Sequence, residues 1–298
     1  MKTIAVDVGA TYIRFGLVQN GAILRRLIYR TPASKNGLAT IFGQAFKILH
    51  QTGATTKTAV GIASIGPLSV RRGVIQRPPN LGLAEVNLRE IVERFHRAEP
   101  VILNDCTAAA LAEKTYGPHR GCDNLVYVTI STGIGGGAVV DGNLLQGKDG
   151  NAVEIGHLVV EYTSRVRCGC GGRGHWEALC SGKGLPNLAS EVYGRKLWQD
   201  SRQIFSAAKH GDKRAVLVIR KMTELNAAGF ASVINAFDPE IVVVGGGVAL
   251  SHPRETVVNA VKHMKKYQTL RAKVVLTSLG PDSPLLGAGA AAAGRHEN

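Results

Sequence analysis

The chain has 298 residues, of which 45% are hydrophobic and 19% charged, and its formal net charge is +14. This length suffices for two domains with sizeable cores, and no apolar run reaches the roughly 18 residues that a membrane-spanning helix needs. The amino-terminal run 1–8 is short and carries charge, so we expect no secretory leader, no membrane partner and a cytoplasmic location.

The positive charge is spread along the chain, at positions such as Arg25, Arg72 and Lys262, and no basic stretch is interleaved with aromatic residues. We therefore expect no nucleic-acid partner. Five cysteines, two of them at positions 168 and 170, do not resemble a disulfide framework. They favour a metal or redox role inside the cell.

Strand and helix patterns alternate through the first third of the chain, which indicates a mixed α/β fold. Helices are predicted where apolar residues recur on one face, around 38–49 and 88–95, and a third is predicted from 106 to 114. Strands are predicted at 4–8, 13–18, 22–30, 58–64, 73–76 and 101–104.

An internal repeat is the most informative feature of the chain's organisation. The strand 124–131 leads into a glycine loop, a second strand at 138–140 and the turn Asp141-Gly142. The start of the chain reads the same way, with a strand, a turn at Gly9, a strand and the turn Asn20-Gly21. Two copies predict two related lobes that face one nucleotide, although common hairpin design is an alternative explanation.

The rest of the chain supplies the elements of a larger lobe and a last helix that completes the first lobe. Helices are predicted at 225–237, near 257–264 and at 286–293, and strands at 241–244 and 274–277. We expect a small α/β lobe over 1–110, completed by 285–298. The larger lobe is expected over 111–284, with an insert rich in glycine and cysteine near 157–177.

Three glycine-containing loops follow predicted strands and are candidates for nucleotide binding. In the first, a carboxylate that could hold Mg²⁺ precedes a glycine that lets the backbone approach an anion. Tight turns without a ligand are the alternative for each loop. The candidate residues are Asp7, Gly9, Ala10 and Thr11, then Thr132, Gly133, Ile134 and Gly135, and finally Gly245, Gly246 and Gly247.

Several motifs together resemble the ROK family of sugar kinases and repressors, in the actin-like ATPase superfamily. They are Asp7–Thr11, Asn104-Asp105, Gly133–Gly136, Glu154-Ile-Gly-His157 and the run Cys168–Glu177. The resemblance covers nearly the whole chain, and the Glu-x-Gly-His motif with its cysteine-rich insert is the specific part. It implies two RNase H-like lobes with a central cleft, a hexose and ATP with Mg²⁺ as ligands, and a homodimer or homotetramer.

Carried over residue by residue, the resemblance makes Asp105 the catalytic base, which accepts the proton of a sugar hydroxyl. A carboxylate there could instead cap the helix that follows. The side chains that the resemblance assigns to sugar binding are Asn80, Asn104, Asp105, Glu154, His157 and Glu177. For the glutamates, solvated surface positions are the alternative.

The resemblance also implies a structural Zn²⁺ site. Its ligands map to His157, Cys168, Cys170 and His175, and the last of these is a cysteine in the family. Imidazole is a good zinc ligand, so the substitution is compatible with a Cys₂His₂ site. A glycine-rich turn with free thiols is the alternative. Val153, where glycine is usual before the glutamate, is a further departure.

We predict from these residues an ATP-dependent hexokinase of glucokinase type that phosphorylates the 6-hydroxyl of glucose or a related hexose. An N-acetylhexosamine, fructose or allose kinase is the alternative within the same chemistry. Two rivals come from other classes. A sugar-responsive DNA-binding regulator would need a reader domain before residue 3, and an actin-like assembly protein would not need the Glu-x-Gly-His motif.

Overall fold

The computed structural model describes residues 1–76 and 85–294, and it divides into two compact units. The first unit comprises Met1–Arg120, Leu144–Ala152 and Asp282–Asn298, and the second comprises Gly121–Asn143 and Val153–Pro281. The segment Leu144–Ala152 thus belongs to the first unit, although the residues on both sides of it belong to the second.

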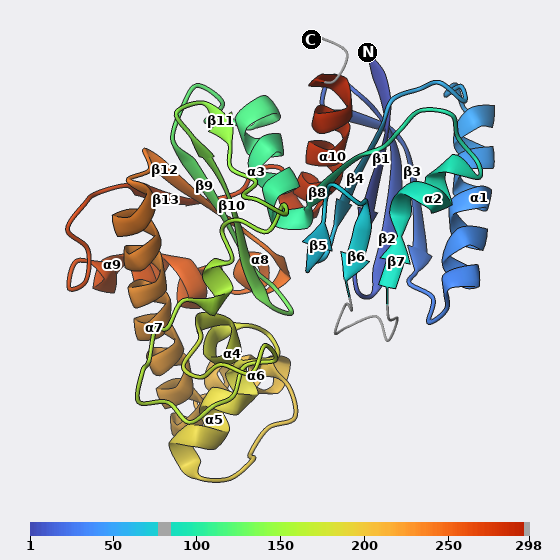
Figure 1. Ribbon diagram of the computed structural model, residues 1–298. Helices are drawn as coiled ribbons and strands as arrows, with labels where there is room; N and C mark the ends of the chain where they lie inside the picture. The colour runs from blue at the N-terminus through green and yellow to red at the C-terminus, as the bar shows by residue number, and fades with distance from the viewer. Residues whose placement is uncertain (77–84, 295–298) are drawn as a thin grey trace. The chain divides into compact units, whose positions relative to one another are not determined.

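A five-stranded sheet organises the first unit, in the order β3-β2-β1-β4-β8 (Figure 1). The first three strands are antiparallel, whereas β4 and β8 run parallel to β1. Its strands are β1 (Lys2–Val8), β2 (Tyr12–Gln19), β3 (Ala22–Arg30), β4 (Val60–Ser64) and β8 (Val101–Asn104), with a small sheet of β5 (Leu68–Ser69), β6 (Val74–Gln76) and β7 (Glu85–Asn87).

The second unit repeats this plan with a sheet in the order β11-β10-β9-β12-β13. Strand β10 is antiparallel to β9, and β12 is parallel to both β9 and β13. The repeat predicted from the sequence is therefore real at the level of topology. The strands are β9 (Leu125–Ile130), β10 (Ile134–Val140), β11 (Asn143–Leu144), β12 (Ile241–Gly245) and β13 (Lys273–Leu276).

Helix α1 (Lys35–Gln51) packs on one face of the first sheet through the apolar stripe that the sequence predicts. The Ser34 side chain caps it by accepting from the Gly37 amide. Phe15 of β2 meets Phe42 of this helix edge to face, with ring centroids 5.0 Å apart. This core fixes the sheet whose strand ends carry the first group of site residues.

Small residues allow close packing on the other face of the first sheet, where helix α10 (Ser283–Gly294) lies beside α3 (Asp105–Tyr116). A Cβ atom at Gly61 would lie 1.8 Å from the Ala288 carbonyl oxygen, and one at Gly287 would lie 1.7 Å from that of Ala108. Glycine is therefore required at both positions. Helix α2 (Leu88–Glu93) also belongs to this unit.

The long helix α7 (Lys213–Phe237) forms the spine of the second unit, and it begins well before the predicted residue 225. Trp176 is fully buried against Phe230 of α7, and its Nε1 donates to Asn226 Oδ1 at 2.8 Å. The other helices here are α4 (Trp176–Cys180), α5 (Leu185–Tyr193), α6 (Ser201–Lys209), α8 (Gly247–Ser251) and α9 (Asn259–Met264), with one helical turn at Ile155–His157, another at Gly280–Asp282 and a π-helical turn at Arg254–Val258.

Candidate active site

A buried carboxylate lies near the end of strand β1 in the first unit. Asp7 is 2% exposed, and the antiparallel register places Arg14 of β2 directly opposite it. Arg14 Nη2 lies 2.8 Å from Asp7 Oδ2, and apart from this ion pair that buried oxygen has no partner among the described residues. Burial raises the pKa of Asp7 to about 6, which Arg14 opposes and the charge of Asp105 reinforces.

The turn after Asp7 is tight. The Gly9 amide donates to the Tyr12 carbonyl at 3.0 Å, and a Cβ atom at Gly9 would lie 2.9 Å from that oxygen. Thr31 fixes the outer side of the turn, because its Oγ1 donates to the Gly9 carbonyl at 2.8 Å. The amide of Gly9 is thus engaged inside the turn, so an anion would have to be met by Ala10 and Thr11.

Asn104 and Asp105 lie where strand β8 ends and helix α3 begins. The cap of α3 is Asn104, whose Oδ1 accepts from the Cys106 amide at 2.9 Å. The capping role that the sequence allowed for Asp105 therefore belongs to its neighbour. Because Oδ1 serves the helix, Asn104 offers its Nδ2 to a ligand, and this atom lies near the backbone of Gly66.

Asp105 is half-buried and occupies the first position of α3. Desolvation raises the pKa of its carboxyl, and the Cys106 amide, which donates to Oδ1 at 2.8 Å, opposes that rise. One carboxylate oxygen is thus held by the helix end. The arrangement fixes the orientation of a base whose proton affinity exceeds that of an ordinary aspartate.

In the second unit, the glycine loop between β9 and β10 is tied to the cysteine-rich insert by Glu177. The Ile134 amide donates to Glu177 Oε2 at 2.9 Å. A Cβ atom at Gly133 would lie 2.2 Å from the same oxygen, so the loop has room for this contact only with glycine there. The Thr132 carbonyl accepts from the Lys183 amide at 3.2 Å, which holds the other side of the loop.

The second glycine loop of this unit lies beside the first at the ends of β9 and β12, since Gly245 pairs with Thr129. Gly246 has a φ of 94°, and a Cβ atom there would lie 2.5 Å from the Ile130 carbonyl oxygen. Helix α8 begins at Gly247. The conformation of Gly246 and its close approach to β9 account for glycine at this position, whereas a Cβ atom at Gly247 would meet nothing nearer than Ser131 Oγ, at 3.9 Å.

Four possible metal ligands gather in the insert of the second unit. The ligand atoms of His157, Cys168, Cys170 and His175 all lie within 4.8 Å of one another. Cys168 Sγ lies 3.7 Å from His157 Nδ1, and Cys170 Sγ lies 3.3 Å from His175 Nδ1. The sulfur–nitrogen edge of a tetrahedral zinc site is about 3.6 Å for the usual bond lengths. The donor set and its spacing therefore fit Zn²⁺.

His157 turns its two ring nitrogens to different neighbours. Nδ1 faces Cys168, whereas Nε2 lies 3.7 Å from Glu154 Oε2. A metal on Nδ1 would leave Nε2 for a ligand beside Glu154. His157 is thus both a candidate metal ligand and a predicted sugar-binding side chain. It lies beside Glu154, a second predicted sugar-binding side chain.

Comparisons with known proteins identify the family to which the chain belongs. The sequence profile of the ROK family matches residues 3–295. The chain is 38% identical to the glucokinase of Aeropyrum pernix, over 96% of this chain and 95% of that one. The chain belongs to the ROK family.

Two solved structures of ROK proteins have the same fold as this chain. The ROK hexokinase of Thermus thermophilus gives a TM-score of 0.88 at 33% identity, with 100% of this chain and 99% of that chain covered. A ROK glucokinase of Streptomyces griseus, in complex with glucose and AMPPNP, gives 0.80 at 29% identity, covering 97% of this chain and 98% of that one. The actin-like ATPase fold predicted from the ROK resemblance is confirmed.

One departure from the ROK pattern has a conformational cost. Val153 stands where the ROK resemblance leads us to expect glycine, and its φ is 65°, a region that β-branched residues rarely occupy. Such a residue costs about 1–2 kcal/mol. Val153 is 9% exposed and lies near Gly136 of β10, so burial offsets part of this strain.

Two residues near the ROK site motifs escaped the sequence reasoning. The proximity of Arg14 to Asp7 can be recognised only from the register of the β1–β2 hairpin, which places the two residues opposite each other. Lys183 follows Gly182, whose amide donates to the Ser131 carbonyl at 2.8 Å, and it therefore sits against the glycine loop of β9. A lysine between two glycines just before α5 was the available signal. Asn80, the remaining sugar-binding candidate, lies outside the described residues.

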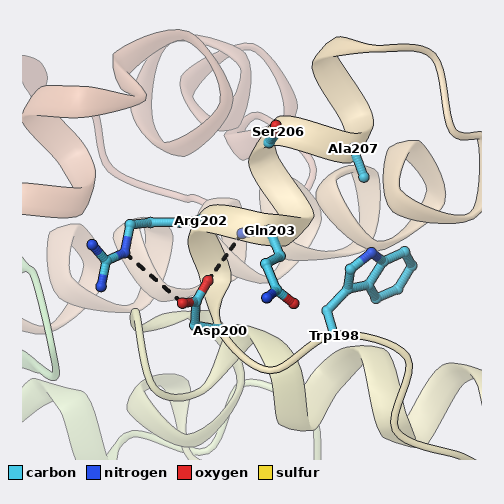
Figure 2. A pocket seen from close by; sticks show the side chains of 6 residues that line it. All are labelled: Trp198, Asp200, Arg202, Gln203, Ser206 and Ala207. Carbon is cyan, nitrogen blue, oxygen red and sulfur yellow. Dashed lines mark hydrogen bonds and ion pairs between the residues drawn. The ribbon is translucent and has the colours of Figure 1, made fainter.

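The hollow in Figure 2 does not coincide with these motifs. It has a volume of about 640 Å³ and is lined by Trp198, Asp200, Arg202, Gln203, Ser206 and Ala207. Asp200 caps α6 by accepting from the Gln203 amide at 3.0 Å, and this explains its orientation. None of the predicted site residues lines this hollow.

Among the described residues, no helix is both long and apolar enough to span a bilayer.

Proposed function

We propose that the protein is an ATP-dependent hexokinase of glucokinase type, which transfers the γ-phosphate of ATP to the 6-hydroxyl of glucose or a related hexose. The observation that carries the proposal is Asp105, a half-buried carboxylate held at the start of α3 beside Asn104. Membership of the ROK family and the similarity to glucokinases support the same reaction.

The proposed chemistry needs alignment and a proton acceptor more than covalent participation by the protein. The oxygen of the sugar 6-hydroxyl forms a bond to the γ-phosphorus while the bond between that phosphorus and the leaving ADP oxygen breaks. Asp105 accepts the proton that the hydroxyl loses. Burial raises the pKa of Asp105, which brings it closer to the pKa that a general base needs near neutral pH. Asn104 Nδ2 would donate to a neighbouring sugar oxygen.

In addition to Asn104, sugar recognition is assigned to three side chains of the second unit. Glu154, His157 and Glu177 present acceptors and an imidazole nitrogen, which suit hydroxyl groups that differ between epimers. Glu177 holds the Ile134 amide through Oε2, so Oε1 is the atom proposed for the sugar. An N-acetylhexosamine, fructose or allose is the alternative substrate, and the panel assay below separates them.

Asp7 is the residue proposed to hold Mg²⁺. The site fits a cation, because Asp7 Oδ2 is buried and its only neighbour of opposite charge among the described residues is the Arg14 guanidinium. Bound with ATP, Mg²⁺ supplies neutralisation of phosphate charge. The phosphates are proposed to meet Ala10 and Thr11 of the first unit and the glycine loops that begin at Thr132 and Gly245.

The zinc site is proposed to be structural. With His157 and His175 joining two cysteines, a bound Zn²⁺ would pin the insert so that Glu177 and His157 keep their orientation. A cytoplasmic location and assembly as a homodimer or homotetramer are also proposed, on the ROK membership alone.

The test is a coupled assay of the purified protein with ATP, Mg²⁺ and a panel of hexoses that includes glucose, mannose, fructose, allose and N-acetylmannosamine. We expect ADP to form with glucose, and ³¹P NMR to identify a 6-phosphate. The absence of ADP with every sugar would contradict the proposal. A gel shift with neighbouring intergenic DNA, which we expect to be negative, tests the regulator instead.

A further inference from the structure

The Arg14 guanidinium lies between two carboxylates of the first unit. Its Nη2 is 2.8 Å from Asp7 Oδ2, and its Nη1 is 3.9 Å from Asp282 Oδ1. Asp282 immediately precedes α10, and it also pairs with Arg26 of β3. One guanidinium is thus placed to neutralise either acid.

The two acids differ in their access to other partners. The Asp7 side chain is 4% exposed, and Arg14 is its ion-pair partner; the Asp282 side chain is 18% exposed and has Arg26 beside it. Arg14 itself is 28% exposed. The guanidinium therefore lies on the solvent side of Asp7, where a cation arriving at the carboxylate would meet it first.

A guanidinium at 2.8 Å and a divalent cation compete for the same oxygen. Two positive groups within about 4 Å of each other repel, and burial weakens the screening of that repulsion. An arriving polyphosphate changes the balance, since it supplies oxygens to both the metal and the arginine. The short step from Asp7 to Asp282 gives the guanidinium a second carboxylate partner.

We propose that Arg14 is a positioning residue that occupies the cation position at Asp7 in the nucleotide-free protein and transfers to Asp282 and phosphate oxygens when Mg·ATP binds. The consequence is that divalent metal enters together with nucleotide, because the free protein binds the metal weakly. This inference rests on the proposed function for its nucleotide, but its first test does not depend on turnover.

That test is Mn²⁺ binding to the nucleotide-free protein, followed at pH 8 by electron paramagnetic resonance. We expect Arg14→Gln to bind Mn²⁺ at least tenfold more tightly than the unmutated protein, and Arg14→Lys to stay within about threefold of it. The matched control is Arg25→Gln, which removes the same charge from an exposed position on β3 and leaves the affinity unchanged. Adding Asp7→Asn to Arg14→Gln should abolish the gained binding.

The second test uses Asp282→Asn in steady-state kinetics. Without the second carboxylate, the KM for Mg·ATP rises several-fold while the KM for glucose stays unchanged. A purely structural ion pair would give no tightening of Mn²⁺ binding in Arg14→Gln, and that result, in a variant whose circular dichroism matches the unmutated protein, overturns the inference. Loss of the proposed function would instead appear as no sugar phosphorylation by the unmutated protein.

Discussion

Replacing Gly133 with alanine is a sharp test of how the second unit couples its phosphate loop to sugar recognition. The added Cβ atom would lie 2.2 Å from Glu177 Oε2 and 3.1 Å from its Cδ, so the carboxylate has to move. Gly133 is not among the residues with positive φ, and alanine therefore adds no backbone strain of that kind. The perturbation is confined to one contact.

The expected magnitude follows from the contact that is lost. The Ile134 amide donates to Glu177 at 2.9 Å, and a hydrogen bond to a charged group contributes about 1.5–3 kcal/mol. If the transition state loses about 2 kcal/mol, kcat/KM falls about 30-fold. Because Glu177 serves both the loop and the proposed sugar site, the KM values for ATP and for glucose should both rise.

The assay is steady-state kinetics with either substrate varied, and Gly121→Ala is the matched control because a Cβ atom there meets nothing within 4 Å. Glu177→Gln keeps an acceptor for the Ile134 amide, so it should raise the KM for glucose more than that for ATP. Kinetics within about twofold of the unmutated protein for Gly133→Ala would refute the coupling, since the geometry leaves Glu177 no way to keep its place.

Two further predictions concern ionisation and metal. Burial raises the pKa of Asp7 to about 6, whereas in the unfolded chain this carboxyl loses its proton near pH 4. The folded state therefore keeps a proton that the unfolded state has released, and the free energy of unfolding falls as the pH rises from about 4 to about 6. Asp7→Asn should therefore raise the free energy of unfolding at pH 8 by up to about 3 kcal/mol, measured by urea titration. The same variant should lose nearly all activity. Equal stability of the two proteins at pH 8 would contradict this. Cys168→Ser should abolish the binding of stoichiometric zinc, measured by atomic absorption, and lower the melting temperature. The control Cys122→Ser should leave zinc content and melting temperature unchanged. Unmutated protein that contains no zinc would contradict the proposed site.

Features that depend on residues close together in the sequence were predictable from it. The buried stripe of α1 and the end of β8 at Asn104 follow from local periodicity and are present in the structure. The family assignment and the fold class were predicted from motifs within short stretches, and the comparisons confirm both. The repeated topology of the two sheets was predicted from a strand, loop and strand pattern in two places.

Features that depend on register or on long-range contacts were not predictable in this way. The position of Arg14 opposite Asp7 needs the exact pairing of β1 and β2, and a shift by one residue would turn its side chain to the other face. The early start of α7 was missed because its first turns mix basic residues with exposed Val216 and Leu217, which obscures the periodicity. The return of Leu144–Ala152 to the first unit rests on contacts such as the Leu68 amide to Asn151 Oδ1, far apart in sequence.

The most direct test of the proposed phosphoryl transfer is the turnover of Asp105→Asn with ATP, Mg²⁺ and glucose. The amide keeps an oxygen for the Cys106 amide, so the variant should fold and bind both substrates with KM values close to those of the unmutated protein. Because asparagine cannot accept the hydroxyl proton, we predict that kcat falls by about 10²–10⁴-fold. A kcat that matches the unmutated protein would contradict the assignment of Asp105 as the catalytic base.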